Sequence, residues 1–370
     1  MTRRFLILAV IAAIACASTA ADKPKKDAKT ANEMGNFSSA AGDKPVGVIP
    51  DAVLRDEKRH RDVAMSIEYP ISAGAYPLII WSHGFGGSDR GYVGLSSYWA
   101  SNGYVVIKPN HADSGKLPSV RSVEEIWESQ TVADYRNRVQ DVTAILDGIA
   151  QLEESYPELK GKIDATKVGV GGHSYGAHTA MLVGGAKTFP DGTSYADPRV
   201  KVILAMSPQG PSDQRGLTKE SFATLTVPAL FMTGTLDNGI SEAETPDWRK
   251  QAYELSPAGD KYLVVLKGAR HLTFAGRVAG MAETMGVTDI VMTDTDPLID
   301  PRRVPYNPST ATIQNRKVPK QDPQLTERAV FGRVKTISIA FWDAYLHGNV
   351  KGKEFLEKLA GRDNVEMVKK

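Results

Sequence analysis

Residues 167–180 read Lys-Val-Gly-Val-Gly-Gly-His-Ser-Tyr-Gly-Ala-His-Thr-Ala. We interpret this stretch as a short apolar strand, a tight glycine-lined turn and a helix that begins with small residues. The turn fits the pattern Gly-x-Ser-x-Gly with Gly172, Ser174 and Gly176. A turn of this kind bends the chain sharply, so that the serine hydroxyl projects above the sheet, and a side chain at either glycine would collide with neighbouring backbone. The pattern favours a nucleophilic Ser174, and the alternative is a glycine-rich turn with a buried serine.

Strand and helix signals alternate along the chain from residue 46 onward. Apolar runs rich in β-branched residues are typical of strands buried on both faces of a parallel sheet. Such runs predict strands at 77–81, 104–107, 168–170, 200–204, 227–232 and 262–266, with an antiparallel edge hairpin at 61–69. Apolar stripes at helical spacing predict helices around 139–152 and 330–345. The alternation predicts an α/β fold with a mostly parallel, doubly wound sheet flanked by helices.

Two polar residues follow the last two predicted strands in the order that completes a Ser–Asp–His triad. Asp237 comes shortly after one strand and His271 after the next, and the carboxyl ends of parallel strands meet at the edge where Ser174 is expected. His271 would take the Ser174 proton during attack on a carbonyl, and Asp237 would orient the imidazole. The alternative for Asp237 is a turn or helix-cap residue, with Glu242 or Glu244 as the acid.

A second glycine-rich loop follows the predicted strand at 77–81 and reads Trp-Ser-His-Gly-Phe-Gly-Gly from residue 81 to 87. We expect this loop, with Gly84 at its bend, to turn a backbone N–H toward the site. The N–H groups of Phe85 and Tyr175 are the predicted donors to an oxyanion. A plain strand–helix turn is the alternative, and neither glycine pattern typical of phosphate binding occurs. The histidines within the two motifs, including His173, are interpreted as packing or hydrogen-bonding residues.

Four segments together resemble the α/β-hydrolase superfamily: His83-Gly-Phe-Gly-Gly87, Gly103-Tyr-Val-Val106, Gly172-His-Ser-Tyr-Gly176 and Gly268-Ala-Arg-His271. The resemblance extends over about residues 46–359. Within the superfamily it is strongest to the branch that holds bacterial platelet-activating-factor-acetylhydrolase-like proteins, chlorophyllases and cutinase-like polyester hydrolases. It implies an α/β-hydrolase fold, a serine-esterase mechanism without cofactor or metal, and a small-molecule or lipid-like ester as substrate.

The expected position of the triad acid differs from its position in one branch of this superfamily. In the phospholipid acetylhydrolases the acid follows the strand after the serine turn, where this chain reads Ala205-Met-Ser-Pro208 and has no aspartate. The acid is therefore expected one strand later, at Asp237. That arrangement is similar to polyester hydrolases and dienelactone hydrolases.

The N-terminal 20 residues have the features of a secretory signal peptide. Arg3 and Arg4 precede an apolar run that is too short to span a bilayer, and small residues lead to an expected cleavage site after Ala20. Cys16, the only cysteine, lies inside this leader, so we expect a mature domain without a disulfide or cysteine chemistry. We expect export to the periplasm or the medium, and the alternative is a membrane-anchored lipoprotein with lipid on Cys16.

Composition and charge fit one large globular domain. The chain of 370 residues is 42% hydrophobic and 24% charged, with a net charge of +2. This balance gives no case for nucleic-acid binding. We expect a disordered spacer at 21–45, the hydrolase domain at 46–362 and a tail at 363–370. An insertion at 274–323 is rich in Pro and Asp and is interpreted as a flap beside the pocket or as a surface excursion; calcium binding by Asp294, Asp296 and Asp300 is a further alternative.

Three classes of function remain open from the sequence. The first is a secreted or periplasmic serine ester hydrolase. The second is an acyltransferase or peptidase that uses the same triad, in which another nucleophile resolves the acyl-enzyme or an amide is cleaved. The third is a non-catalytic binding protein with the same fold.

Overall fold

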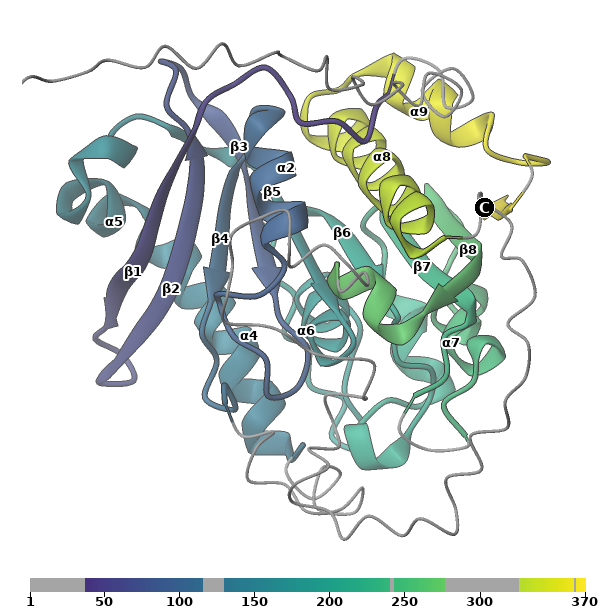
Figure 1. Ribbon diagram of the computed structural model, residues 1–370. Coiled ribbons are helices and arrows are strands. Elements are labelled where there is room, and N and C mark those ends of the chain that lie inside the picture. Colours follow the sequence, from purple (N-terminus) through teal and green to yellow (C-terminus); the bar gives the residue numbers. More distant parts are fainter. Residues whose placement is uncertain (1–36, 116–129, 240–242, 277–325, 363) are drawn as a thin grey trace, which may run out of the picture.

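The computed structural model of the protein describes residues 37–115, 130–239, 243–276, 326–362 and 364–370. Within these residues a nine-stranded sheet has the order β1-β2-β4-β3-β5-β6-β7-β8-β9 (Figure 1). The strands are β1 Val46–Asp56, β2 Arg61–Pro70, β3 Tyr76–Ser82, β4 Val105–Pro109, β5 Ile163–His173, β6 Val200–Met206, β7 Ala229–Leu236, β8 Lys261–Arg270 and β9 Val365–Lys369.

The middle of the sheet is parallel and its edges are antiparallel. Strands β4, β3, β5, β6, β7 and β8 pair in parallel, whereas β1 and β2 at one edge and β9 at the other pair antiparallel. The predicted parallel strands and the antiparallel character of the edge are therefore confirmed, but the hairpin predicted at 61–69 is a single strand, β2, whose partner is β1. All six parallel strands end at one edge of the sheet, which is where ligands usually bind in folds of this kind.

Helices cover both faces of the sheet. The helices are α2 Val93–Ser101, α4 Val132–Asp147, α5 Ile149–Ser155, α6 Tyr175–Val183, α7 Pro246–Glu254, α8 Glu327–Leu346 and α9 Val350–Glu357, with 3₁₀ turns η2 Pro157–Leu159, η3 Asp213–Arg215, η4 Lys219–Thr224 and η5 His271–Ala275. Helices α4, α6 and α7 contribute to the hydrophobic cluster on one face, and α2, α8 and α9 contribute to the cluster on the other. No helix among the described residues combines the length and the apolar character that crossing a membrane requires.

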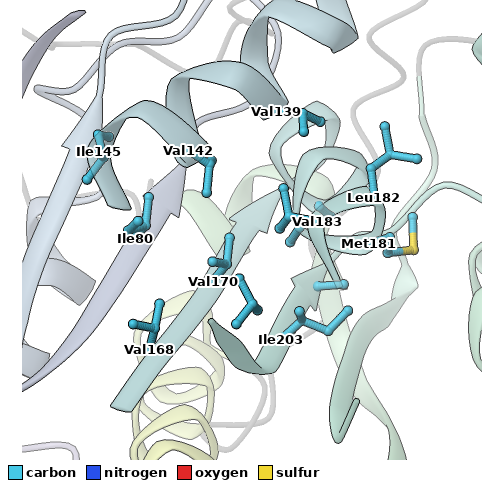
Figure 2. Packing of buried hydrophobic residues seen from close by; sticks show 14 of the residues in the cluster. Ile80, Val139, Val142, Ile145, Val168, Val170, Met181, Leu182, Val183 and Ile203 are labelled. Carbon is cyan, nitrogen blue, oxygen red and sulfur yellow. The ribbon is translucent and has the colours of Figure 1, made fainter. Parts of the chain in front are cut away.

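The two-residue period of β3 explains why the strand is apolar throughout. Leu78 and Ile80 belong to the cluster under α4 and α6, whereas Ile79 and Trp81 belong to the cluster under α2 and α8. Figure 2 shows the first cluster, in which side chains from α4 and α6 meet those of β3, β5 and β6. Burial on both faces removes the alternation of polar residues that a half-exposed strand would show.

The predicted helix at 139–152 is divided into α4 and α5 at Gly148. A Cβ atom at Gly148 would clash with the Leu54 side chain of β1. The Leu54 side chain of the edge strand therefore packs directly against the backbone at Gly148, and a larger residue there would require Leu54 to shift. The apolar stripe still continues, because Val142 and Ile145 of α4 and Leu152 of α5 all lie in the same cluster.

Both ends of the folded domain differ from the predicted boundaries. The predicted tail at 363–370 contains β9, which pairs antiparallel with β8 from Val365 to Lys369. The second part of the predicted spacer, residues 37–45, lies against the folded domain: Phe37 packs near Phe355 and the Tyr98 hydroxyl donates to the Ser38 carbonyl. Residues 1–36, and so the leader and Cys16, lie outside the described residues, as do residues 277–323 of the predicted insertion.

Deletion of residues 364–370 tests whether the last strand belongs to the sheet. Removal of β9 exposes the edge of β8 and the buried Val365, so we expect the free energy of unfolding to fall by about 2 kcal/mol or more. Urea denaturation measures this change, with Val368→Ser as the control because that side chain is exposed. Equal stability of the deletion and the control would contradict the assignment.

Candidate active site

Ser174 lies in a sharp turn between β5 and α6. Its backbone has φ 55° and ψ −120°, which a residue other than glycine rarely adopts. The chain passes directly from the strand end at His173 to the helix start at Tyr175, and the Ser174 N–H donates to the Met206 carbonyl at 2.9 Å. His173 and Tyr175 are buried, whereas Ser174 is partly exposed. The serine is thus the accessible residue of the turn.

The two glycines of the motif allow backbone segments to come into direct contact. A Cβ atom at Gly172 would overlap the backbone of Gly176, and one at Gly176 would overlap the carbonyl of Ser82 at the end of β3. The turn is therefore packed both against itself and against the start of the glycine-rich loop at 83–87. A larger residue at Gly172 would distort the serine turn itself, and one at Gly176 would push the turn away from the end of β3.

Asp237 and His271 are hydrogen-bonded to each other beside this turn. Asp237 follows β7, His271 directly follows β8, and Asp237 Oδ1 lies 2.9 Å from His271 Nδ1. The imidazoles of His271 and His173 lie with their centres 4.6 Å apart, so His271 packs against the residue that precedes Ser174. The His271 side chain keeps 22% of its surface exposed and that of Asp237 none. A ligand can therefore reach the His271 imidazole, whereas the Asp237 carboxylate is fully buried.

Four donors surround the buried Asp237 carboxylate. Ser207 Oγ and Thr233 Oγ1 donate to Oδ2 at 2.7 and 2.9 Å, while Arg249 Nε lies 3.1 Å from Oδ1, which also faces His271. Burial by itself would raise the pKa of Asp237. The charge of Arg249 and the hydrogen bonds from His271 and Ser207 outweigh burial and hold the pKa well below its usual range. Asp237 is therefore an ionised carboxylate that can stabilise a positively charged imidazole.

Of the two alternative acids, Glu244 does not bond to His271 in the described structure and pairs with Arg215 instead. The Glu244 carboxylate bonds to Arg215, and its nearest approach to Arg249 is 3.7 Å. Glu242 lies outside the described residues. Arg249 itself is buried and also donates to the carbonyls of Asp237 and Ser207. Nothing in the sequence pattern indicates this role for Arg249, because a charged residue in an amphipathic helix ordinarily lies on the solvent side.

The loop after β3 presents Phe85 between two anchored neighbours. The Gly84 N–H donates to Tyr92 Oη and the Gly86 N–H donates to Asp113 Oδ2, each at 3.0 Å. The rings of Phe85 and Tyr175 lie 6.2 Å apart, edge to face. Because Tyr175 is the first residue of α6, its N–H has no acceptor within that helix. The two predicted oxyanion donors thus belong to neighbouring residues.

A buried ion pair holds this loop in place. Arg138 of α4 donates to both carboxylate oxygens of Asp113, at 2.8 and 2.6 Å, and to the His83 carbonyl at 2.7 Å. Its guanidinium carbon also lies 4.3 Å from the centre of the Tyr175 ring. Burial would raise the pKa of Asp113, but Arg138 outweighs burial and holds the pKa well below its usual range. The sequence gives no sign of this pair, because Asp113 and Arg138 are far apart in the chain and fit no motif.

A second array of serine, histidine and aspartate lies beneath the loop. Ser82 Oγ is 2.8 Å from His111 Nε2, and His111 Nδ1 is 2.9 Å from Asp141 Oδ2. All three side chains are buried, and Arg59 also pairs with Asp141. A substrate has no access to a serine in this position, so the array connects β3, the end of β4 and α4. The other histidines of the two motifs, His83, His173 and His178, are also buried and hydrogen-bonded.

The parallel sheet, the strained serine turn after β5 and the loops after β3, β7 and β8 define an α/β-hydrolase fold. Residues 45–188 match the family model described as Chlorophyllase. The chain is also similar to a platelet-activating factor acetylhydrolase from Cavia porcellus, with 27% identity over 235 residues, which are 55% of this chain and 50% of that protein. The chain thus spans about half the length of this curated relative.

Asp113→Asn tests the buried pair through its pH dependence. Because the pKa of Asp113 is lowered in the folded protein, the ionised carboxylate stabilises the fold above its unfolded pKa of about 3.9. This stabilising contribution is lost as the pH falls toward the pKa that Asp113 has in the folded protein. We therefore expect the stability difference between wild type and Asp113→Asn to be larger at pH 7 than at pH 3. Urea unfolding at both pH values measures the difference, and an equal difference at the two would contradict the pairing.

Proposed function

We propose that the protein is an exported serine hydrolase that cleaves carboxylic esters through a Ser174–Asp237–His271 triad and an acyl-enzyme. The proposal rests on one observation. The His271 imidazole is hydrogen-bonded to the buried, ionised Asp237, and the same imidazole packs against the strained serine turn. The similarity to chlorophyllases and to an acetylhydrolase supports hydrolysis of an ester.

Acylation begins with attack of Ser174 Oγ on the ester carbonyl carbon. His271 Nε2 takes the hydroxyl proton, and Asp237 stabilises the imidazolium from the Nδ1 side. The carbonyl oxygen becomes an oxyanion, which the N–H groups of Phe85 and Tyr175 stabilise; such donors contribute about 3 kcal/mol each to the transition state. The intermediate collapses, the C–O bond to the alcohol breaks, and His271 returns the proton to the departing alkoxide.

Deacylation repeats these steps with water as the nucleophile. His271 takes a proton from water, whose oxygen attacks the acyl carbon, and then returns the proton to Ser174 as the acid leaves. No step requires a cofactor. Because transfer to another nucleophile would proceed through the same acyl-enzyme, hydrolysis with and without added alcohol or amine separates an esterase from a transferase.

The substrate class is proposed from the relatives. The relative named platelet-activating factor acetylhydrolase makes a short acyl group the first candidate. A panel of p-nitrophenyl esters of graded acyl length on the purified mature chain tests this choice. We expect the highest kcat/KM at short acyl lengths, and a maximum at long chains would point to a lipase-like pocket.

Export is proposed from the leader. We expect the mature chain to begin after Ala20 and to be recovered from the periplasm or medium. N-terminal sequencing of the recovered chain measures the cleavage site. A chain that begins at a lipid-modified Cys16 would instead establish a membrane-anchored lipoprotein.

Ser174→Ala removes the proposed nucleophile and leaves the fold intact. We expect hydrolysis of short p-nitrophenyl esters to fall to background, and labelling by a fluorophosphonate to disappear. The thermal midpoint should change little, because Ser174 is partly exposed and the variant removes one oxygen atom. Retained hydrolysis and labelling in this variant would exclude Ser174, whereas a wild-type protein that neither hydrolyses nor labels would favour a binding protein.

Asp237→Asn keeps the size of the side chain and removes its charge. The amide can present its NH₂ group to His271 and so stabilise the wrong imidazole tautomer, and we expect kcat to fall by about a thousandfold or more. Kinetics with p-nitrophenyl acetate measures this loss. Full activity of the variant would transfer the role of the acid to Glu242 or Glu244.

A further inference from the structure

Three consecutive hydrogen bonds connect the loop after β3 with the segment after β8. The Gly84 N–H donates to Tyr92 Oη at 3.0 Å, Tyr92 Oη lies 3.0 Å from His173 Nδ1, and His173 Nε2 lies 2.9 Å from the His271 carbonyl oxygen. Gly84 precedes the proposed oxyanion donor Phe85, His173 precedes the proposed nucleophile, and His271 is the proposed base. We refer to the three bonds as the Tyr92–His173 relay.

The chemistry of the two ends fixes the direction of the relay. The carbonyl of His271 can only accept, so His173 Nε2 must carry a proton. Burial, and next the charge of His271, lower the pKa of His173 well below its ordinary value, so the ring is neutral and its Nδ1 is an acceptor. The Tyr92 hydroxyl therefore donates to Nδ1 and accepts from Gly84. Tyr92 thereby selects the His173 tautomer that can bond to the His271 backbone.

The backbone of Tyr92 supports a role in positioning. Tyr92 immediately precedes α2 and has φ 61° and ψ 19°, a left-handed conformation that an aromatic residue rarely adopts. Its ring packs edge to face on Trp81, at 5.6 Å between centres, and near His173 at 5.8 Å. Strained residues of this kind persist where surrounding contacts hold them, and they concentrate at functional sites.

We infer that Tyr92 and His173 are positioning residues that set the distance between the proposed oxyanion loop and the His271 segment. The inference rests on the proposed function, because it concerns the same site. Tyr92 acts through the backbone of Gly84, and His173 acts through the His271 carbonyl and through its ring contact with the His271 imidazole. The loop that bears Phe85 and the segment that bears the base thus move together with the serine turn.

Tyr92→Phe removes one oxygen atom from the relay and keeps the ring packing. We expect kcat for p-nitrophenyl acetate to fall about tenfold while KM stays within about twofold, because the loss affects groups that act in the transition state. The matched control is Tyr104→Phe. Tyr104 is buried at the amino end of β4, and its hydroxyl donates to Asp343. We expect this control to lose thermal stability and to keep the wild-type kcat.

A double-variant cycle separates a connected relay from two independent contacts. His173→Phe keeps an aromatic ring beside His271 and removes both nitrogens. If the relay acts as one unit, a change at either residue breaks it, and a second change adds little. The kcat of the double variant Tyr92→Phe/His173→Phe is then within about twofold of the kcat of the slower single variant. Losses that multiply in the double variant would overturn the relay.

The results distinguish this inference from the proposed function. A wild-type protein without ester hydrolysis or fluorophosphonate labelling overturns the proposed function and the relay with it. An active, labelled wild type together with a wild-type kcat in Tyr92→Phe overturns the relay alone. An equal fall in kcat for Tyr92→Phe and Tyr104→Phe also overturns it, because that result indicates a general loss of stability.

Discussion

Direct backbone packing at the serine turn is the constraint on which the candidate site depends. Gly176 lies against the carbonyl of Ser82 and Gly172 against Gly176, at separations where no side chain fits. This packing fixes the end of β5 against the end of β3. Backbone contacts alone therefore place the proposed nucleophile next to the proposed oxyanion loop.

Two buried arginines stabilise the loops on either side of this contact. Arg138 pairs with Asp113 under the loop that bears Phe85, and Arg249 lies against Asp237 behind His271. Removing one partner of a buried ion pair is strongly destabilising, because it leaves an unpaired charge in the interior. The rigidity of the site thus comes from contacts that a substrate does not reach. The same buried contacts explain how partly exposed loops can hold the proposed oxyanion donors, the N–H groups of Phe85 and Tyr175, in a fixed direction.

The proposed acid, Asp237, receives a hydrogen bond from the end of the neighbouring strand. The end of β6 supplies Ser207 in a left-handed conformation, φ 49°, and its hydroxyl donates to the Asp237 carboxylate from the end of β7. The strand end that lacks an aspartate in this chain therefore still contributes to the acid through a hydrogen bond. This feature is compatible with a relative at 27% identity, because the fold and the turn can be retained while the contacts around the acid change.

The sequence by itself determined the parallel strands, the antiparallel strand at the edge and the order of Ser174, Asp237 and His271, because strand periodicity and the glycine-flanked turn are local properties of the chain. Only the tertiary structure decided which side chains meet. The contacts of Arg138, Tyr92 and Ser207 join positions far apart in the chain and follow no fixed spacing. The same holds for β9 and for the packing of residues 37–45, since a short segment becomes ordered only when a distant surface offers it hydrogen bonds and apolar contacts.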